Sequence, residues 1–292
     1  MSARLLEICV FAKQYFDPRS LIVATQDGRP IGFIHVGFGP DSVGKTLSTE
    51  TGIVHMAMLH SERDDPQLAD DLLRQGEAWL TNAGAKRILG GGRPPFSQFY
   101  LGLYGGSELP GVLTSDTWMT ELLLRGGYQM IEELAVMHRD LVSFRPPVSR
   151  NVRRLRREVE MQQDAHLELG TWWEAHKHID QELVRFELTP FGSQEALAHV
   201  SCWDIEPLAT TWGVPTVGMV DLATAETHRR RGLATYLLAE AFRVLRVRGV
   251  SMVESHIRSD HTAALALCHK LGFTQIDAGR LYEKTHSAQP SD

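Results

Sequence analysis

The order of helix and strand signals along this chain occurs twice, and that repetition constrains the fold more than any other feature. In each half, β-rich runs precede a long amphipathic helix, a short strand, a second helix and a strand-rich close. The sequence predicts the long helices at 66–84 and 231–249, and the second helices at 115–127 and 260–272. One order occurring twice predicts an internal duplication of a unit of roughly 140 residues.

Two other segments carry local patterns that predict a structure. Asp27-Gly28 stands between two β-rich runs, and this residue pair favours a tight hairpin turn. The run TWWEAHKHIDQELVRF at 171–186 has the apolar spacing of a helix. We therefore expect a hairpin near the start of the first half and a helix near the start of the second.

Composition limits the class of protein. The chain has 292 residues, of which 43% are hydrophobic and 23% charged, a mixture typical of globular domains that bury a core. A net charge of -6 argues against nucleic acid as a partner. The three cysteines, Cys9, Cys202 and Cys268, are widely separated, which argues against a disulfide framework and favours a reducing cytoplasm. No signal-peptide pattern appears and no apolar run is long enough for a membrane span, so we expect a cytoplasmic protein.

Residues 143–157 have the composition of a domain boundary. Pro146-Pro147 interrupts regular structure, and an arginine-rich run follows. This run is interpreted either as a solvated linker or as a site for an anionic partner. The sequence therefore predicts domains at 1–142 and 158–286, a linker at 143–157, and a flexible tail at 287–292. The arginines of the run are Arg150, Arg153, Arg154, Arg156 and Arg157.

Three consecutive arginines and a glycine, Arg229–Gly232, stand between a strand-like run and the helical pattern at 231–249. A helix that begins directly after such a loop presents free backbone N–H groups and a partial positive charge, so it attracts anions. Gly232 has no Cβ to obstruct an anion, and Ala234 is small. The pattern favours a loop that holds a pyrophosphate; the alternative is a basic helix start without a ligand.

The spacing of this loop resembles a known family motif. Arg229-x-x-Gly232-x-Ala234 is similar to the Arg/Gln-x-x-Gly-x-Gly/Ala signature of the GNAT superfamily of acetyl-CoA-dependent N-acyltransferases. The later run SHIRSDHTAALALCHKLGF resembles the second motif of the family, Asn-x-x-Ala-x-x-x-Tyr-x-x-x-Gly-Phe. The positions that correspond to this second motif are His261, Ala264, Cys268, Gly272 and Phe273.

The resemblance implies an α/β (α+β) fold of two GNAT-like domains, each a twisted mixed, mainly antiparallel sheet flanked by helices. It also implies acetyl-CoA as co-substrate, with no metal. The pantetheine arm would follow the strand Val217–Thr224, which would splay from the strand at 250–258, and the pyrophosphate would meet the loop. The implied cofactor-binding residues are Leu222, Ala223, Thr224, Arg229, Arg230, Arg231, Gly232, Leu233, Ala234, Thr235 and His261.

The catalytic residues implied by the resemblance are His256, Glu254 and Cys268. Some family members place a catalytic glutamate where this chain has His256, whose ring can accept a proton near neutral pH. Glu254 lies two positions earlier, on the same face of the strand. Otherwise, His256 is a hydrogen-bonded histidine of the pocket. Asp221 is expected to face away from the acceptor.

Cys268 stands where the family usually has a tyrosine that acts as the acid. A thiol is a poorer donor, and the alternative is a small apolar residue on the core-facing side of a helix. His261 stands in place of the usual Asn, where it either orients the cofactor arm or lies exposed.

The first half lacks the loop signature. Asp64 falls on the position of Arg229, Gln67 on that of Gly232, and Leu123 on that of the family's acid. Carboxylates such as Asp64 and Asp65 would repel a pyrophosphate. The resemblance thus extends to tandem-GNAT proteins, with a degenerate N-terminal half.

These observations predict an acetyl-CoA-dependent N-acetyltransferase whose C-terminal domain acetylates an amine of unknown identity. The alternative is a non-catalytic acyl-CoA-binding or regulatory tandem-GNAT protein. The expected partners are acetyl-CoA and the amine acceptor, without a membrane, and a homodimer stays open.

Overall fold

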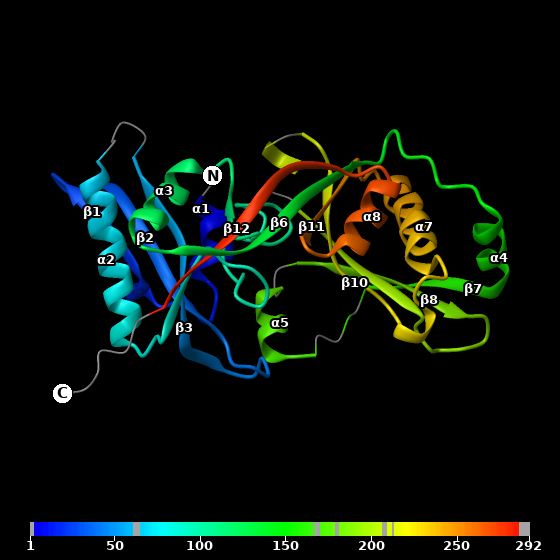
Figure 1. Cartoon of the computed structure of the whole chain (residues 1–292), viewed down its shortest axis with the longest axis horizontal. Helices are drawn as coiled ribbons and strands as arrows, with labels where there is room; N and C mark the ends of the chain where they lie inside the picture. Colours follow the sequence, from blue (N-terminus) through cyan, green and yellow to red (C-terminus); the bar gives the residue numbers. More distant parts are fainter. Residues whose placement is uncertain are drawn as a thin grey trace. The chain divides into compact units, whose positions relative to one another are not determined.

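A computed structural model describes residues 3–60, 65–165, 167, 170–178, 181–205, 209–211 and 213–285 (Figure 1). The chain forms two compact units. Unit 1 comprises Met1–Leu134, Gly170–Lys177 and Asp277–Asp292, and unit 2 comprises Ala135–Leu169 and His178–Ile276. None of the described helices is long and apolar enough to cross a membrane.

Unit 1 is built on a sheet with the strand order β1-β2-β3-β4-β12, and β5 also pairs with β12. Strands β1 and β2 form the predicted hairpin, because Asp27 and Gly28 both adopt the positive φ values, 52° and 76°, that a tight turn requires. The elements of unit 1 are α1 (Ala3–Leu6), η1 (Glu7–Phe11), η2 (Pro18–Ser20), β1 (Leu21–Gln26), β2 (Arg29–Pro40), β3 (Leu47–Leu59), α2 (Pro66–Asn82), β4 (Arg87–Gly90), β5 (Val112–Leu113), α3 (Thr117–Arg125), α5 (Trp172–Lys177) and parts of β6 (Gln129–Asp140) and β12 (Thr274–Thr285).

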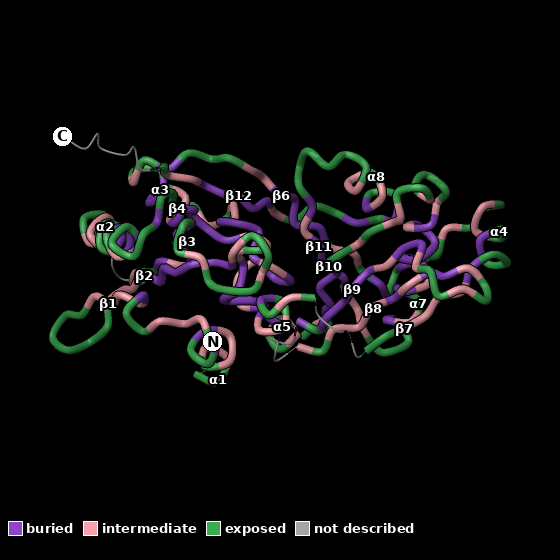
Figure 2. The backbone as a smooth tube through the Cα atoms, turned by 90° about the horizontal axis from the view of Figure 1, so that it is seen from below, coloured by how far each residue is buried: buried purple, intermediate pink, exposed green. Residues whose placement is uncertain are grey.

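Helix α2 covers one face of the unit 1 sheet by packing on β2 and β3. It begins where the sequence predicts, with Pro66 in its first turn and the Asp65 side chain as its cap. Its buried residues, among them Leu72 and Leu80, pack in one cluster with Ile34 and Val36 of β2, while the opposite side of the helix stays exposed (Figure 2).

Unit 2 contains the strand order β6-β11-β10-β9-β8-β7. Strands β7 to β10 pair antiparallel, whereas β10 and β11 pair parallel, so the sheet is mixed and mainly antiparallel, as predicted. The elements of unit 2 are α4 (Arg150–Glu158), β7 (Val159–Asp164), β8 (Leu183–Pro190), β9 (Ala198–Asp204), β10 (Thr216–Thr224), η3 (Glu226–His228), α7 (Leu233–Val247), β11 (Met252–Arg258), α8 (Thr262–Lys270) and the remaining parts of β6 and β12.

Helix α7 is the central helix of unit 2. Its apolar face, including Leu237, Ala241 and Phe242, is fully buried in the core of the unit, and the helix packs on β8, β9 and β10. The helix ends near Gly249, whose φ of 90° terminates the helical path. These features fix the start of α7, and with it the loop before the helix, against the sheet.

The boundaries of the units differ from the predicted domains at 1–142 and 158–286. Both β6 and β12 are divided between the units, with Gln129–Leu134 and Asp277–Thr285 in unit 1. A continuous strand carries no composition break, so the sequence gives no sign of such a division. Residues 286–292, which include the predicted tail, lie outside the described residues.

The structure differs from the sequence prediction in two segments of the second half. Residues 150–157 of the predicted linker belong to helix α4, in which Leu155 is buried in the core of unit 2. The predicted helix at 171–186 is helical only over Trp172–Lys177, and Leu183–Pro190 forms strand β8. In β8, Phe186 and Leu188 alternate inward, and this burial in the sheet outweighs the helical spacing of the apolar residues.

Candidate functional site

Strands β10 and β11 separate near the middle of the unit 2 sheet. Their parallel pairing covers Thr216 to Gly218, with Gly218 opposite Glu254, although β10 continues to Thr224. Asp221 has a φ of 54°, and the pairing of β10 with β9 shifts register between Val220 and Ala223. This bulge bends β10 away from β11 and creates the predicted splay.

The loop from Arg229 to Gly232 leads from β10 and η3 into helix α7. Arg230 and Gly232 both have positive φ, 62° and 83°, and α7 begins at Leu233. Gly232 is the N-cap residue, and no side chain caps the helix. The N–H groups of its first turn are therefore available to an external acceptor, and the helix dipole makes that position attractive to an anion.

A cavity of about 550 Å³ opens at this helix start. Its lining brings together every predicted cofactor-binding residue except Arg231, which is not among the described residues that line it. His261, the exposed N-cap residue of α8, is one of the lining residues. The lining residues are Leu222, Ala223, Thr224, His228, Arg229, Arg230, Gly232, Leu233, Ala234, Thr235, His261, Ala263, Ala264 and Leu267.

Four of these lining residues are not among the predicted cofactor-binding residues. His228 precedes the arginines, and Ala263, Ala264 and Leu267 lie on one side of α8. Of these, only Ala264 belongs to the second motif. All three residues of α8 have small or apolar side chains at helical spacing, and together they form an apolar wall of the cavity. The cavity thus combines an apolar wall with a basic, uncapped helix start.

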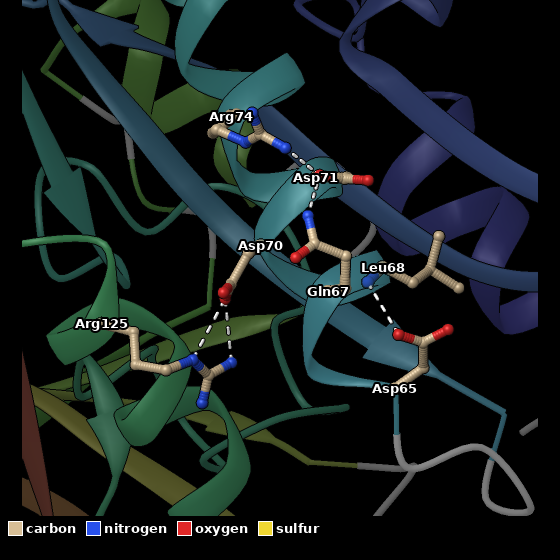
Figure 3. A network of polar contacts seen from close by, with 7 residues as sticks. All are labelled: Asp65, Gln67, Leu68, Asp70, Asp71, Arg74 and Arg125. Atoms are coloured by element: carbon tan, nitrogen blue, oxygen red, sulfur yellow. Dashed lines mark hydrogen bonds and ion pairs between the residues drawn. The ribbon is translucent and has the colours of Figure 1, made fainter.

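The corresponding helix start in unit 1 is closed by its own side chains (Figure 3). Oδ1 of Asp65 accepts the N–H of Leu68 at 3.0 Å and so occupies the position that an anion would take. The side chain of Gln67 is turned to Asp71, with 3.0 Å between Nε2 and Oδ1. Asp70 pairs with Arg125 at 3.0 Å. Asp64 lies outside the described residues.

Glu254 lies between two histidines on the unit 2 sheet. Its side chain is 2% exposed; Oε2 is 2.8 Å from Nε2 of His138, and Oε1 is 3.3 Å from Nε2 of His256. The His256 side chain is 4% exposed, and neither ring nitrogen makes an aligned hydrogen bond to the described residues. Since pairing with β10 ends at Glu254, His256 stands just beyond the point where the strands separate.

His138 is not among the residues predicted from sequence. This residue lies on β6, 116 positions before Glu254, and no local motif surrounds it. The ring of His138 reaches the carboxylate of Glu254 because β6 lies beside β11 in the sheet.

Two other candidates have structural partners or surroundings. Cys268 is buried in the core cluster of unit 2, and burial raises the pKa of its thiol to about 12, which favours the packing alternative. Asp221 accepts a bond from Arg185 at 2.9 Å and lies 3.3 Å from Nε2 of His199. The hydrogen bond with His199 and the charges of both partners lower the pKa of the Asp221 carboxyl.

Comparisons with known proteins point to one family. The sequence model of the acetyltransferase (GNAT) family matches residues 150–273. The comparison with curated proteins found no match. No group of three or more His, Cys, Asp or Glu residues that could hold a metal occurs in the part of the chain that the structure describes.

Solved structures share the fold at low sequence identity. A tandem GNAT protein from the clavulanic acid biosynthesis pathway is 15% identical, with a TM-score of 0.64 over 100% of this chain and 91% of that one. A GCN5-related N-acetyltransferase from Sphaerobacter thermophilus is 16% identical, with a TM-score of 0.58 over 97% of this chain and 91% of that one.

A third match is the GCN5-related glucosamine N-acetyltransferase region of a fungal multi-domain GH3 β-N-acetylglucosaminidase. It is 14% identical, with a TM-score of 0.65, and the alignment covers 96% of this chain and 36% of that protein. Residues 150–273, which carry the splayed strands and the cavity, therefore form a domain of the acetyltransferase (GNAT) family, in a chain with the fold of a tandem GNAT protein.

Proposed function

We propose that this chain is an acetyl-CoA-dependent N-acetyltransferase whose active site lies in unit 2. The observation that carries the proposal is the cavity at the uncapped start of α7, beside the splay of β10 from β11. Backbone N–H groups and arginines at one end suit the phosphates, and the apolar side of α8 suits the pantetheine arm. The corresponding helix start of unit 1, that of α2, is instead capped by the side chain of Asp65.

In this proposal, acetyl-CoA supplies the acetyl group as a thioester, and residues of this chain hold and orient the ligand. The N–H groups around Gly232 and the first turn of α7 bind the pyrophosphate, with charge from Arg229 and Arg230. Strand β10 offers backbone groups at Leu222 to Thr224, because it has already left β11 there. The left-handed Gly232 fits this role, since its backbone approaches the cavity without a Cβ.

We assign proton removal from the amine to His256, backed by Glu254. Glu254 is buried against the ring, so its carboxylate stabilises the imidazolium that forms when His256 accepts the proton. His138 holds the second oxygen of Glu254 at 2.8 Å and so fixes the carboxylate. Cys268 receives no role, because its thiol belongs to the core.

Two measurements test the proposal. Isothermal titration with acetyl-CoA should give one site per chain, and thiol release should follow addition of a suitable amine. The amine panel should include glucosamine, because one structural relative is a glucosamine N-acetyltransferase region, together with a polyamine, an aminoglycoside and a peptide with a free N-terminus. Absence of acetyl-CoA binding would overturn the proposal. Binding without thiol release from any amine would favour the alternative, a non-catalytic acyl-CoA-binding protein.

A further inference from the structure

The side chain of Asn151, on helix α4, contacts the loop Arg229–Gly232, called here the cofactor loop because of the proposed function. Nδ2 of Asn151, in the first turn of α4, donates to the carbonyl oxygen of Arg231 at 2.9 Å. The two residues are 80 positions apart, and Asn151 belongs to neither family motif. The hydrogen bond therefore joins the arginine-rich run to the loop before α7.

The amide of Asn151 is held in one orientation. Its Oδ1 accepts Nη2 of Arg154 at 2.8 Å, and Nη1 of Arg154 bonds Glu158 at 3.1 Å. With the oxygen end occupied by a guanidinium, the NH₂ end must face the loop. Helix α4 is itself anchored, because Leu155 is only 3% exposed in the core of unit 2.

The hydrogen bond fixes the direction of one peptide group in the loop. In a trans peptide, the C=O and the N–H point in opposite directions. When Asn151 holds the carbonyl of Arg231, the N–H of Gly232 is turned away from Asn151. Gly232 lines the cavity, whereas Asn151 and Arg231 are not among the described residues that do. The N–H is thus directed to the cavity side.

The contact also explains why position 232 is a glycine in this chain. A Cβ on Gly232 would overlap Nδ2 of Asn151. The φ of 83° independently disfavours a side chain. A larger residue would therefore strain the backbone and displace the amide that holds the loop.

We infer that Asn151 is a positioning residue for the coenzyme: it holds the Arg231 carbonyl outward, so that the Gly232 N–H faces the phosphates. The inference rests on the proposed function. It assigns part of the affinity for the coenzyme to helix α4, which lies outside both family motifs. Asn151 does not touch the ligand; it acts on the loop.

The test combines Asn151→Asp and Asn151→Ala with two readouts. Aspartate in the first turn of a helix is favourable, so Asn151→Asp should fold well although it removes the donor. Titration with coenzyme A should give about three- to tenfold weaker binding for Asn151→Ala, and at least about tenfold weaker binding for Asn151→Asp. Trypsin should cleave after Arg229–Arg231 faster in both variants, because the loop has lost its tether.

Arg156→Ala is the matched control. It removes the 3.6 Å pair between Arg156 and Glu240, which joins α4 to α7 without contacting the loop, and it should change neither readout. Unchanged affinity and cleavage in folded Asn151→Asp would overturn the inference and leave the proposed function intact. If the wild-type chain binds no coenzyme A, the proposed function fails first, and the role of Asn151 in binding fails with it.

Discussion

Nε2 of His138 lies 2.8 Å from Oε2 of Glu254, across 116 positions of sequence. The carboxylate reaches His256 with its other oxygen, so one buried acidic group joins two imidazoles. Three ionisable groups in so little space are costly unless they stabilise one another, and such arrangements are common at functional sites.

His256→Ala should lower kcat by roughly 10²–10⁴ with a working amine, because the amine loses its proton acceptor. Acetyl-CoA affinity should hardly change, since His256 is not among the described residues that line the cavity. Glu254→Gln should also lower kcat, by removing the charge that stabilises the imidazolium. His269→Ala, an exposed change on α8, is the control. Full activity of both variants would exclude this pair as the base.

Replacement of His138 should affect turnover through Glu254. His138→Ala should lower kcat more than His138→Gln, because a glutamine amide can still donate to the carboxylate. Neither change should alter acetyl-CoA affinity, so steady-state kinetics and calorimetry together separate a positioning role from general damage. An equal loss of kcat in His138→Ala and His138→Gln would show that the hydrogen bond to Glu254 is not the cause of the loss.

Two glycines near the ends of α7 provide a matched test of the loop. Gly232 and Gly249 both have positive φ, 83° and 90°, but a Cβ on Gly249 would meet nothing within 4 Å. Gly232→Asp should weaken acetyl-CoA binding at least tenfold, about 1.4 kcal/mol, through overlap with Asn151 and repulsion of phosphate. Gly249→Ala should lower the free energy of unfolding without changing acetyl-CoA affinity. Gln67→Asp in unit 1 should leave binding unchanged, and a comparable loss there would assign the site to unit 1.

The cysteines should differ in reactivity. Burial raises the pKa of Cys202 and of Cys268 to about 12, so both thiols stay protonated at pH 8, whereas Cys9 is half-buried. Maleimide labelling of the folded chain, followed by mass spectrometry, should modify Cys9 first. Cys268→Ala should reduce the free energy of unfolding by about 1 kcal/mol and leave kcat nearly unchanged. Loss of turnover in that variant would restore Cys268 as the acid.

Unit 1 should be sensitive to acid through a buried histidine pair. Burial lowers the pKa of His35 to about 3, and burial together with His35 lowers that of His55. A histidine in the unfolded chain titrates near 6.5, so stability is fully present above about pH 6.5 and is lost as pH falls toward 3.

His35→Gln should therefore flatten the fall in stability below pH 6.5, by up to about 1.4 kcal/mol per pH unit for one proton. Urea unfolding followed by circular dichroism at pH 7 and 4.5 measures the difference, with the exposed His269→Gln as control. An unchanged pH dependence would mean that His35 is protonated in the folded chain.

The position of the Arg229–Gly232 loop before α7 could be predicted from sequence because the pattern is local. A strand, an arginine–glycine loop and a helix follow one another within about twenty residues, and backbone rules alone bring Leu222 to Thr235 together. The wrong prediction at 171–186 also came from a local pattern. The spacing of apolar residues there is typical of a helix, but pairing with β7 and β9 makes Leu183–Pro190 a strand. Local pattern predicts structure only where no distant partner competes.

Sequence by itself therefore determined the hairpin at Asp27-Gly28, the start of α2 at Pro66 and the loop before α7 at Gly232, because each depends on residues close in the chain. The tertiary structure alone decided that β6 brings His138 to Glu254 and that α4 brings Asn151 to Arg231. The residues around His138 and Asn151 in the sequence form no local pattern that would predict these contacts. Strand pairing and helix packing between distant segments set those distances, and a single sequence does not record which segments will pair.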